Sequence, residues 1–343
     1  MSKGELNFKT FPINNTHGIY SFRHMGQFEI LCLIGKGHFS SVFKAIQKGS
    51  KNSKSSKIFN YIIKIFKKNI LEEKNTTSEA PKKIQFFEII EVSLLRRIKN
   101  IGNPNLIQMY DWNIDRKTCE VRILMEYMPC DLRNYFATES HYKDLDENLL
   151  KKIAFQILNG LKALHKNRII HFDIKPENIL FDPKTNLVKI TDFSLSQYIT
   201  YDTDKNVLTN GGTYPYMPVE CLIGCKKTSF NCDVWSLGCI LFELTCGKIP
   251  FLGDDQNAVL NKINGIFGSD IKPNTTYDEL CKYSVNLADE KKRLMNLIKK
   301  NQKIKFVNDD FFDFISSILC INPLYRLNSE EALKHPWLVD YSE

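Results

Sequence analysis

The sequence HFDIKPENIL at residues 171–180, followed by TDFS at residues 191–194, is the most diagnostic part of this chain. Polar residues alternate there with apolar and β-branched ones, which should fix the direction in which the polar side chains point. Asp173 can accept a proton from a hydroxyl group, and Lys175 can offset negative charge on a phosphoryl group. Asn178 and Asp192 can supply oxygen ligands to magnesium. This set of residues predicts phosphoryl-transfer chemistry.

A glycine-rich turn lies upstream, in the sequence IGKGHFSSV at residues 34–42. Gly35 and Gly37 would let the backbone N–H groups approach a phosphate closely. A Gly-x-Gly turn is also common in ordinary hairpins, so by itself the signal is weak. A strand follows the turn, which disfavours a dinucleotide-binding fold because that fold needs a helix there.

Lys64 lies near the end of an apolar run, YIIKIF at residues 61–66. A lysine in this position usually marks an exposed strand terminus. Paired with a glutamate on the next helix, however, it could be held in place to bind phosphates. Glu91, at the apolar margin of that helix and followed by two leucines, is the preferred partner, and Glu88 is the alternative.

Hydrophobic periodicity predicts two regions of different character. Residues 28–128 are rich in short strands with one helix at about residues 83–100, and two polar stretches, about 48–58 and 67–82, are expected to be loops. After Pro129 the pattern changes to amphipathic helices. These are expected at about residues 146–166, 231–247, 255–266, 309–320 and 329–335.

The composition excludes several classes of protein. With 43% hydrophobic and 25% charged residues the chain is an ordinary globular one, not a disordered or low-complexity one. A net charge of +8 is too modest to indicate a dedicated nucleic-acid binder. No apolar run reaches the length of a membrane span and no signal peptide is visible, so we expect an intracellular protein, cytoplasmic or nuclear. None of the ten cysteines forms a Cys-x-x-Cys pair. Those at positions 225, 232, 239 and 246 are expected to pack in the core.

From about Phe28 to Leu338 the chain resembles the eukaryotic protein kinases, whose motifs it carries in the family's order. The resemblance implies an α+β, bilobal protein-kinase fold with Mg-ATP bound in the cleft between the lobes. An N-terminal extension (1–24) would precede a small β-sheet lobe (25–128) and a mainly helical lobe (129–343), with a group-specific insert at about 268–308.

The resemblance also assigns roles to individual residues. Asp173, Lys175, Lys64 and Glu91 correspond to the catalytic set, and Asn178 and Asp192 to the magnesium ligands. Glu220 and Arg326 correspond to an ion pair that ties the activation segment to the large lobe. The residues that correspond to the nucleotide site are Ile34, Gly35, Gly37, Val42, Ile62, Lys64, Met125, Glu126, Met128 and Leu180.

Two features refine the resemblance. Lys175, two residues after Asp173, and Thr213 follow the serine/threonine pattern, which implies protein substrates that bear Ser or Thr. Stretches such as residues 168–171 and the sequence HPWL at 335–338 resemble the CMGC group, on the side of the SR-protein kinases and LAMMER kinases. A monomer without membrane or nucleic-acid partners is expected. Basic residues in the insert are either a solvated face or a docking surface for acidic partners.

Several positions depart from the family pattern. Phe172 replaces the arginine that anchors a phosphorylated loop, so we expect activity that does not depend on phosphorylation of Thr203 or Thr209. Ser40 and Ser194 stand where the family has glycines, and they would be strained if φ were positive there. Ile62 replaces a usual alanine and should tighten the nucleotide pocket. The alternative to an active kinase is a nucleotide-binding scaffold, a pseudokinase, although the residues that such proteins typically lose are present.

Overall fold

The computed structural model describes residues 19–22, 25–36, 40–48, 60–66, 86–115, 119–200, 211–225, 227–283, 287–303 and 308–341. The chain divides into two compact units, with the main boundary between Met128 and Pro129. Unit 1 comprises residues 1–102 and 107–128, and unit 2 comprises residues 103–106 and 129–343. The two stretches expected to be loops fall almost entirely outside the described residues.

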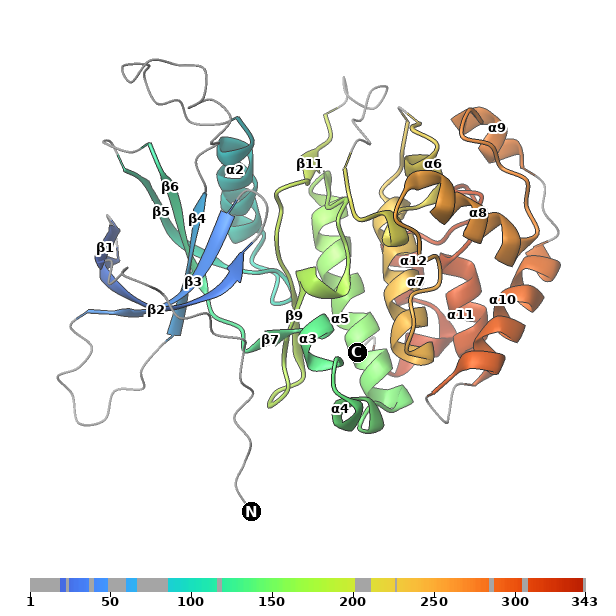
Figure 1. The fold of residues 1–343 in the computed structure, drawn as a ribbon, viewed down its shortest axis with the longest axis horizontal. Helices are drawn as coiled ribbons and strands as arrows, with labels where there is room; N and C mark the ends of the chain where they lie inside the picture. The colour runs from blue at the N-terminus through green and yellow to red at the C-terminus, as the bar shows by residue number, and fades with distance from the viewer. Residues whose placement is uncertain are drawn as a thin grey trace. The chain divides into compact units, whose positions relative to one another are not determined.

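The described part of unit 1 contains an antiparallel six-stranded sheet in the order β1-β2-β3-β4-β6-β5 (Figure 1). One face of the sheet carries a buried core that includes Phe28, Ala45, Ile63 and Leu124. Because neighbouring residues of a strand face opposite sides, the residues next to these core positions lie on the other face. The strands are β1 (Ile19–Phe22), β2 (Gly26–Lys36), β3 (Ser40–Gln47), β4 (Asn60–Phe66), β5 (Met109–Ile114) and β6 (Val121–Glu126).

Strand β1 corrects the expectation that residues 1–24 form an irregular extension. It pairs antiparallel with β2, with Phe22 opposite Gly26. Phe22 is buried, and its ring meets that of Phe28 edge-on at 5.6 Å between centroids. A short apolar strand is therefore held to the sheet by aromatic burial, a contact that the sequence pattern did not indicate.

Helix α2 (Phe86–Ile101) is the helix expected at about residues 83–100. Its apolar residues Leu94, Leu95 and Ile98 are buried, as their helical spacing predicts. The helix packs against β5 within unit 1. It thereby carries Glu88 and Glu91 on a rigid element.

Unit 2 is mainly helical, as Figure 1 shows in green to red. Helices α5, α7, α8 and α11 occur where the sequence predicts them, whereas α10 was not predicted. Helix α7 is buried along almost its whole length, including Cys232, Cys239 and Cys246. The helices are α3 (Leu132–Tyr135), α4 (Glu139–Lys143), α5 (Glu147–Lys166), α6 (Val219–Leu222), α7 (Asn231–Cys246), α8 (Gln256–Phe267), α9 (Tyr277–Lys282), α10 (Leu287–Asn301), α11 (Asp309–Ile318) and α12 (Ser329–Leu333), with the 3-10 turn η4 (Pro336–Tyr341) near the end.

Short strands hold the segment that carries the decisive motif. Strands β10, β9 and β7 form one small sheet, and β11 pairs with β8 in another. The motif runs from the end of β8 through the turn η2 into β9, so strands fix both of its ends. These elements are β7 (Cys130–Asp131), β8 (Ile169–Ile170), η2 (Pro176–Asn178), β9 (Ile179–Asp182), β10 (Leu187–Ile190), β11 (Gln197–Tyr198) and the turn η3 (Tyr214–Tyr216).

Candidate active site

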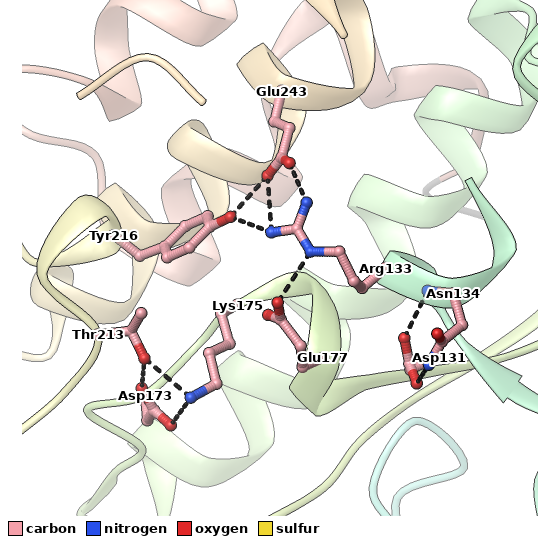
Figure 2. Close-up of polar contacts among 9 residues, drawn as sticks. All are labelled: Asp131, Arg133, Asn134, Asp173, Lys175, Glu177, Thr213, Tyr216 and Glu243. Atoms are coloured by element: carbon pink, nitrogen blue, oxygen red, sulfur yellow. Dashed lines mark hydrogen bonds and ion pairs between the residues drawn. The ribbon is translucent and has the colours of Figure 1, made fainter. Parts of the chain in front are cut away.

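The side chains of Asp173, Lys175 and Thr213 in unit 2 form a closed polar ring (Figure 2). The Thr213 hydroxyl donates to Asp173 Oδ1 at 2.8 Å, and Lys175 Nζ lies 2.7 Å from Asp173 Oδ2. Lys175 Nζ also donates to Thr213 Oγ1 at 2.8 Å. Asp173 is only 7% exposed, so its carboxylate is held in one orientation by groups that are themselves linked. The resemblance connected Thr213 with the serine/threonine pattern, and the structure places its hydroxyl against Asp173.

Asn178 completes the surroundings of this carboxylate. Its side-chain NH₂ donates to the Asp173 carbonyl at 2.8 Å and to Asp173 Oδ2 at 2.9 Å. This leaves the amide oxygen of Asn178 as the atom that can bind a cation. The Thr191 N–H donates to the Asn178 carbonyl at 3.0 Å, which ties the chain just before Asp192 to the same segment.

Asn178 and Asp192 offer oxygen donors, the kind that a divalent cation takes in phosphoryl-transfer sites. Within the described parts of the chain, no three His, Cys, Asp or Glu side chains are grouped so that they could hold a metal ion. Magnesium in phosphoryl-transfer sites is typically held by one or two side-chain oxygen donors, and phosphates and water complete its shell. Asn178 and Asp192 are suited to that partial role.

Asp233, on the buried helix α7, anchors the backbone of the catalytic segment. Its Oδ2 accepts the His171 N–H at 2.9 Å and its Oδ1 accepts the Phe172 N–H at 3.0 Å. His165 Nε2 lies 2.9 Å from Oδ2. Burial alone would raise the pKa of the Asp233 carboxyl, but the hydrogen bond from His165 and the nearby imidazoles hold it below its usual value. A charged carboxylate therefore accepts two successive N–H groups just before Asp173.

Backbone strain lies at two motif residues, but not at the serines. Phe172 has φ of 64° and Asp192 has φ of 62°. Ser40 and Ser194 do not have positive φ, so the strain considered for them does not arise. Non-glycine residues in the left-handed region cost about 1–3 kcal/mol each and concentrate at functional sites. The strain at Phe172 and Asp192 is consistent with a segment whose geometry is set by function.

Within unit 1, strand β4 and helix α2 bring Lys64 and Glu91 together. Lys64 Nζ lies 2.5 Å from Glu91 Oε1, and the two residues are 6% and 2% exposed. Glu88, the alternative partner, is also buried, but the observed ion pair is to Glu91. A buried lysine held by a carboxylate presents its charge in a fixed position instead of extending into solvent.

The other candidate nucleotide residues of the sheet lie on adjoining strands. Gly35 is opposite Val42, and Val42 is opposite Lys64 in the next strand pair. Ile62, two residues before Lys64 and thus on the same face, is opposite Met125. The register therefore gathers these residues on the face that also carries Lys64, opposite the apolar core.

Neither the backbone conformation nor the packing within unit 1 requires glycine at position 35. Its φ is not positive, and an added Cβ would lie 3.6 Å from the Val42 Cβ, which is an ordinary contact. The bare backbone at this position leaves room for a group that approaches from outside, such as a phosphate. Ile34 lies beside it in β2, whereas Gly37 is outside the described residues.

The remaining nucleotide candidates have fixed backbones. The Glu126 N–H donates to the Gln108 carbonyl at 3.0 Å, and Glu126 Oε1 accepts the Gln108 N–H at 2.7 Å. Met128, at the end of unit 1, is buried. In unit 2, Leu180 lies in β9 between Asp131 of β7 and Lys189 of β10. No pattern in the sequence indicated the partners of Glu126 or Leu180.

A second polar network, around Arg133, was missed by the sequence reasoning. Figure 2 shows the guanidinium between Glu177 and Glu243, with Tyr216 beside it. Arg133 Nε donates to Glu177 Oε1 at 2.8 Å, Arg133 Nη1 pairs with Glu243 Oε1, and the Tyr216 hydroxyl donates to Glu243 Oε2 at 2.7 Å. Burial and the Glu243 carboxylate raise the pKa of Tyr216. The network joins α3, η2, η3 and α7, whose residues are up to 110 positions apart, so no local signal could have found it.

The ion pair implied for Glu220 and Arg326 is present in unit 2. Arg326 Nη1 and Nη2 donate to the two Glu220 carboxylate oxygens at 2.6 and 3.0 Å. Both side chains are fully buried, and the guanidinium lies 5.0 Å from the centroid of the Trp235 ring. Although Pro218-Val219 departs from the family sequence, Glu220 keeps its partner.

Comparison with known proteins agrees with this geometry. A family model described as the protein kinase domain matches residues 28–338, and the chain belongs to this family. A probable cyclin-dependent serine/threonine-protein kinase of Dictyostelium discoideum is 30% identical over 318 residues, which are 92% of this chain and 21% of that protein. A probable serine/threonine-protein kinase of the same organism is 27% identical over 333 residues, 94% of this chain and 49% of that protein. The chain thus spans about a fifth and about half of the length of these two relatives.

The sequence predicts no membrane-spanning segment, and the helices of the structure can be compared with that prediction. Among the residues that the structure describes, no helix is both long and apolar enough to cross a bilayer.

Proposed function

We propose that this protein is an active serine/threonine protein kinase that transfers the γ-phosphoryl group of ATP to protein hydroxyls. The observation that carries the proposal is the ring of Asp173, Lys175 and Thr213, in which a buried carboxylate is oriented by a lysine and a threonine. Membership of the protein kinase family and the similarity to proteins named serine/threonine kinases support it.

The chemistry follows from the groups in place. Asp173 orients the Ser or Thr hydroxyl of the substrate and accepts its proton as the oxygen attacks the γ-phosphorus. The bond from that phosphorus to the bridging oxygen breaks, and ADP leaves. Lys175 offsets charge on the γ-phosphoryl group, and Lys64, fixed by Glu91, offsets charge on the α and β phosphates.

Magnesium is the metal that we propose for this reaction. When bound, it would neutralise phosphate charge, held by the amide oxygen of Asn178 and the carboxylate of Asp192. Gly35, Val42, Ile62, Met125 and Leu180 would contact the nucleotide, together with the backbone of Glu126 and Met128 and the glycine turn.

The test is transfer of labelled γ-phosphate from Mg-ATP to arrayed Ser and Thr peptides. Asp173→Asn should lower transfer by about 100- to 10,000-fold, because it removes the proton acceptor but keeps the shape. The matched control is Asp144→Asn, the same change at an exposed position at the end of α4, which should leave transfer unchanged. A protein that binds ATP but transfers no phosphate even at high concentration would instead be a pseudokinase scaffold.

We further propose placement in the CMGC group, on the motifs at residues 168–171 and 335–338. An arginine-rich substrate would need an acidic groove, whereas Lys292, Arg293, Lys299 and Lys300 form an exposed basic face on α10. The peptide array therefore includes arginine-serine, acidic and proline-directed sets, and the preferred set identifies the substrate class.

Activity without activation-loop phosphorylation is part of the proposal. Phe172 cannot bind a phosphate as an arginine would, while its backbone N–H is already held by Asp233. Thr203 and Thr209 lie outside the described residues. Phosphatase treatment, or replacement of both threonines by alanine, should change turnover by less than tenfold. A larger change would contradict the proposal.

A further inference from the structure

Unit 2 contains a cavity that is lined by a buried carboxylate. Part of the cavity wall belongs to the expected insert at residues 268–308, and the rest belongs to the segments that pack against it. The cavity has a volume of about 240 Å³ and lies where α10 meets α11 and the segment after it. Its wall includes Phe267, Leu287, Leu319, Cys320 and Tyr325, together with Glu290 of α10. None of these residues takes part in the proposed phosphoryl transfer.

Glu290 is an unusual group in such a place. It is 5% exposed, and no described residue donates a hydrogen bond to its Oε1. A buried carboxylate oxygen without a hydrogen-bond partner is costly, so a native protein that keeps one usually has a reason for it. Burial raises the pKa of Glu290 to about 7. The free protein thus holds an acid that gains from a positively charged partner.

The charged and titratable groups around the cavity do not supply that partner. Lys291, the next residue, lines the cavity but pairs with Asp313 of α11, and His335 lies 3.2 Å from the same carboxylate. The remaining titratable neighbours are Tyr283, Tyr325 and Cys320, which cannot carry positive charge. Among the described residues, none therefore offers Glu290 a cation.

We propose that this cavity receives one arginine side chain of a partner protein, with its guanidinium paired to Glu290. The volume is below the range of about 300–1,000 Å³ that is typical of small-molecule pockets, and it suits a single long side chain. The apolar part of the wall matches the methylene stem of arginine, beside the polar residues Asp313, Ser316 and Ser317 that also line the cavity. A guanidinium is more weakly hydrated than an ammonium group.

The surroundings indicate the kind of segment that carries this arginine. Leu287 and Tyr325 line the cavity and are 48% and 62% exposed, and Leu324 beside them is 67% exposed. These side chains offer an apolar rim for residues next to the arginine, as at the centre of many protein interfaces. The exposed basic face of α10 would repel further positive charge. The segment is therefore a single arginine among apolar and acidic residues.

Binding can be measured at the cavity itself by methyl NMR of the full chain, with leucine methyls labelled. The first probe is N-acetyl-arginine amide, and its neutral control is N-acetyl-citrulline amide. The arginine probe should shift the Leu287 and Leu319 methyls, and the citrulline probe should not. Binding should be about five- to tenfold tighter at pH 8 than at pH 6, because the cation needs the ionised carboxylate and a group with a pKa near 7 is mostly protonated at pH 6.

Variants separate charge from shape. Glu290→Gln keeps the side-chain volume and should abolish binding of the arginine probe, whereas Asp289→Asn, an exposed neighbour on the same helix, should not. Equal binding of the citrulline and arginine probes to the unchanged protein would overturn the proposal, whatever the fold of the variant.

Further probes test whether the bound guanidinium belongs to a protein segment or to a free small molecule. A pentapeptide Asp-Leu-Arg-Leu-Asp should bind at least tenfold more tightly than one in which lysines replace both aspartates. It should also bind more tightly than agmatine, a free small cation of the same chemistry. If agmatine binds as tightly as the acidic peptide, the site serves a small molecule and the partner-protein proposal is wrong. These readouts need no catalysis, so they remain informative if phosphoryl transfer fails.

Discussion

Gly212 shows how a single residue without a side chain positions Thr213. Its φ is +123°, and a Cβ there would lie 2.8 Å from the Phe172 carbonyl oxygen. Both facts require glycine, because other residues rarely adopt this conformation and the oxygen belongs to a backbone that Asp233 holds. The threonine that donates to Asp173 follows directly in the chain. The geometry of the Asp173 carboxylate thus depends on a residue that has no side chain of its own.

We predict that Gly212→Ala lowers turnover about ten- to a hundredfold, because Thr213 and the Phe172 backbone must shift and small displacements in an active site are costly. The matched control is Gly211→Ala. Its Cβ would approach the Leu195 side chain no closer than 3.4 Å and its φ is not positive. Steady-state kinetics should show near-normal turnover for the control. Equal losses in both variants would mean that general loosening of the loop, not the position of Thr213, is responsible.

Glu290 makes a separate prediction about stability and pH. Its pKa is raised from 4.5 to about 7 in the folded chain, so the folded state holds this proton more tightly than the unfolded state. The stabilisation from the protonated form is complete below about pH 4.5 and is lost as pH rises through about 7. The loss is about 1–3 kcal/mol.

The Glu290→Gln variant should therefore gain stability over the natural protein as pH rises from 5 to 8. Urea unfolding of both proteins at pH 5 and pH 8 measures the difference in their free energies of unfolding. The contributions of the other titrating groups are the same in both proteins and cancel in this difference. Asp289→Asn, at an exposed site, should show no such trend. A gap between Glu290→Gln and the natural protein that is the same at both pH values would contradict the raised pKa.

At the scale of elements, two glycines in helices of unit 2 differ in how closely other residues approach them. In α7, a Cβ on Gly238 would lie 2.6 Å from the Leu319 side chain, so the backbone of this buried helix approaches the segment after α11 too closely for any side chain. In α8, nothing lies within 4 Å of a Cβ on Gly265. The first glycine is required by packing and the second is not.

Gly238→Ala should lower the free energy of unfolding by about 1–3 kcal/mol through overpacking. Gly265→Ala should leave it unchanged or raise it by up to about 1 kcal/mol, since alanine restricts the unfolded chain and favours helix. Denaturant unfolding of the two variants checks both directions. A stabilising Gly238→Ala would mean that Leu319 can move away at little cost.

Elements with strong periodicity could be predicted, and those held by distant contacts could not. The apolar run at residues 61–66 forms strand β4, and helices α2, α5, α7, α8, α11 and α12 all lie close to their expected positions. Strand β1 and helix α9 were missed, because one depends on aromatic burial and the other is only six residues long. For α10, the spacing of Leu294 and Ile298 could have indicated a helix, but the many lysines favoured a loop or a solvated face.

At the scale of the whole molecule, site residues that are close in sequence could also be predicted, and those brought together from distant parts of the chain could not. The motif at residues 171–194 supplied Asp173, Lys175, Asn178 and Asp192 because these residues are close in sequence. The Arg133 network and the Glu290 cavity join residues far apart in sequence, and their chemistry appears only when the chain is folded. The pair of Glu220 and Arg326 is also distant, and it was expected only because the family resemblance supplied it.

That pair allows a prediction about the stability of the whole chain, since it joins residues 106 positions apart with no exposure to solvent. Removing one partner leaves an uncompensated buried charge and should cost about 3–5 kcal/mol, whereas removing both should cost less than the sum of the two. We expect Glu220→Gln and Arg326→Met each to unfold at much lower denaturant concentration, and the double variant to recover at least 2 kcal/mol of the summed loss.

The two single variants are expected to be the weakest folders. If neither yields soluble protein, recovery of soluble protein by the double variant provides the same comparison. Additive losses would show that each side chain acts through its own packing, Arg326 against Trp235 in particular, and that the charges contribute little. A loss below 1 kcal/mol in either single variant would exclude a desolvated ion pair, because no screening by water is available where both side chains are fully buried.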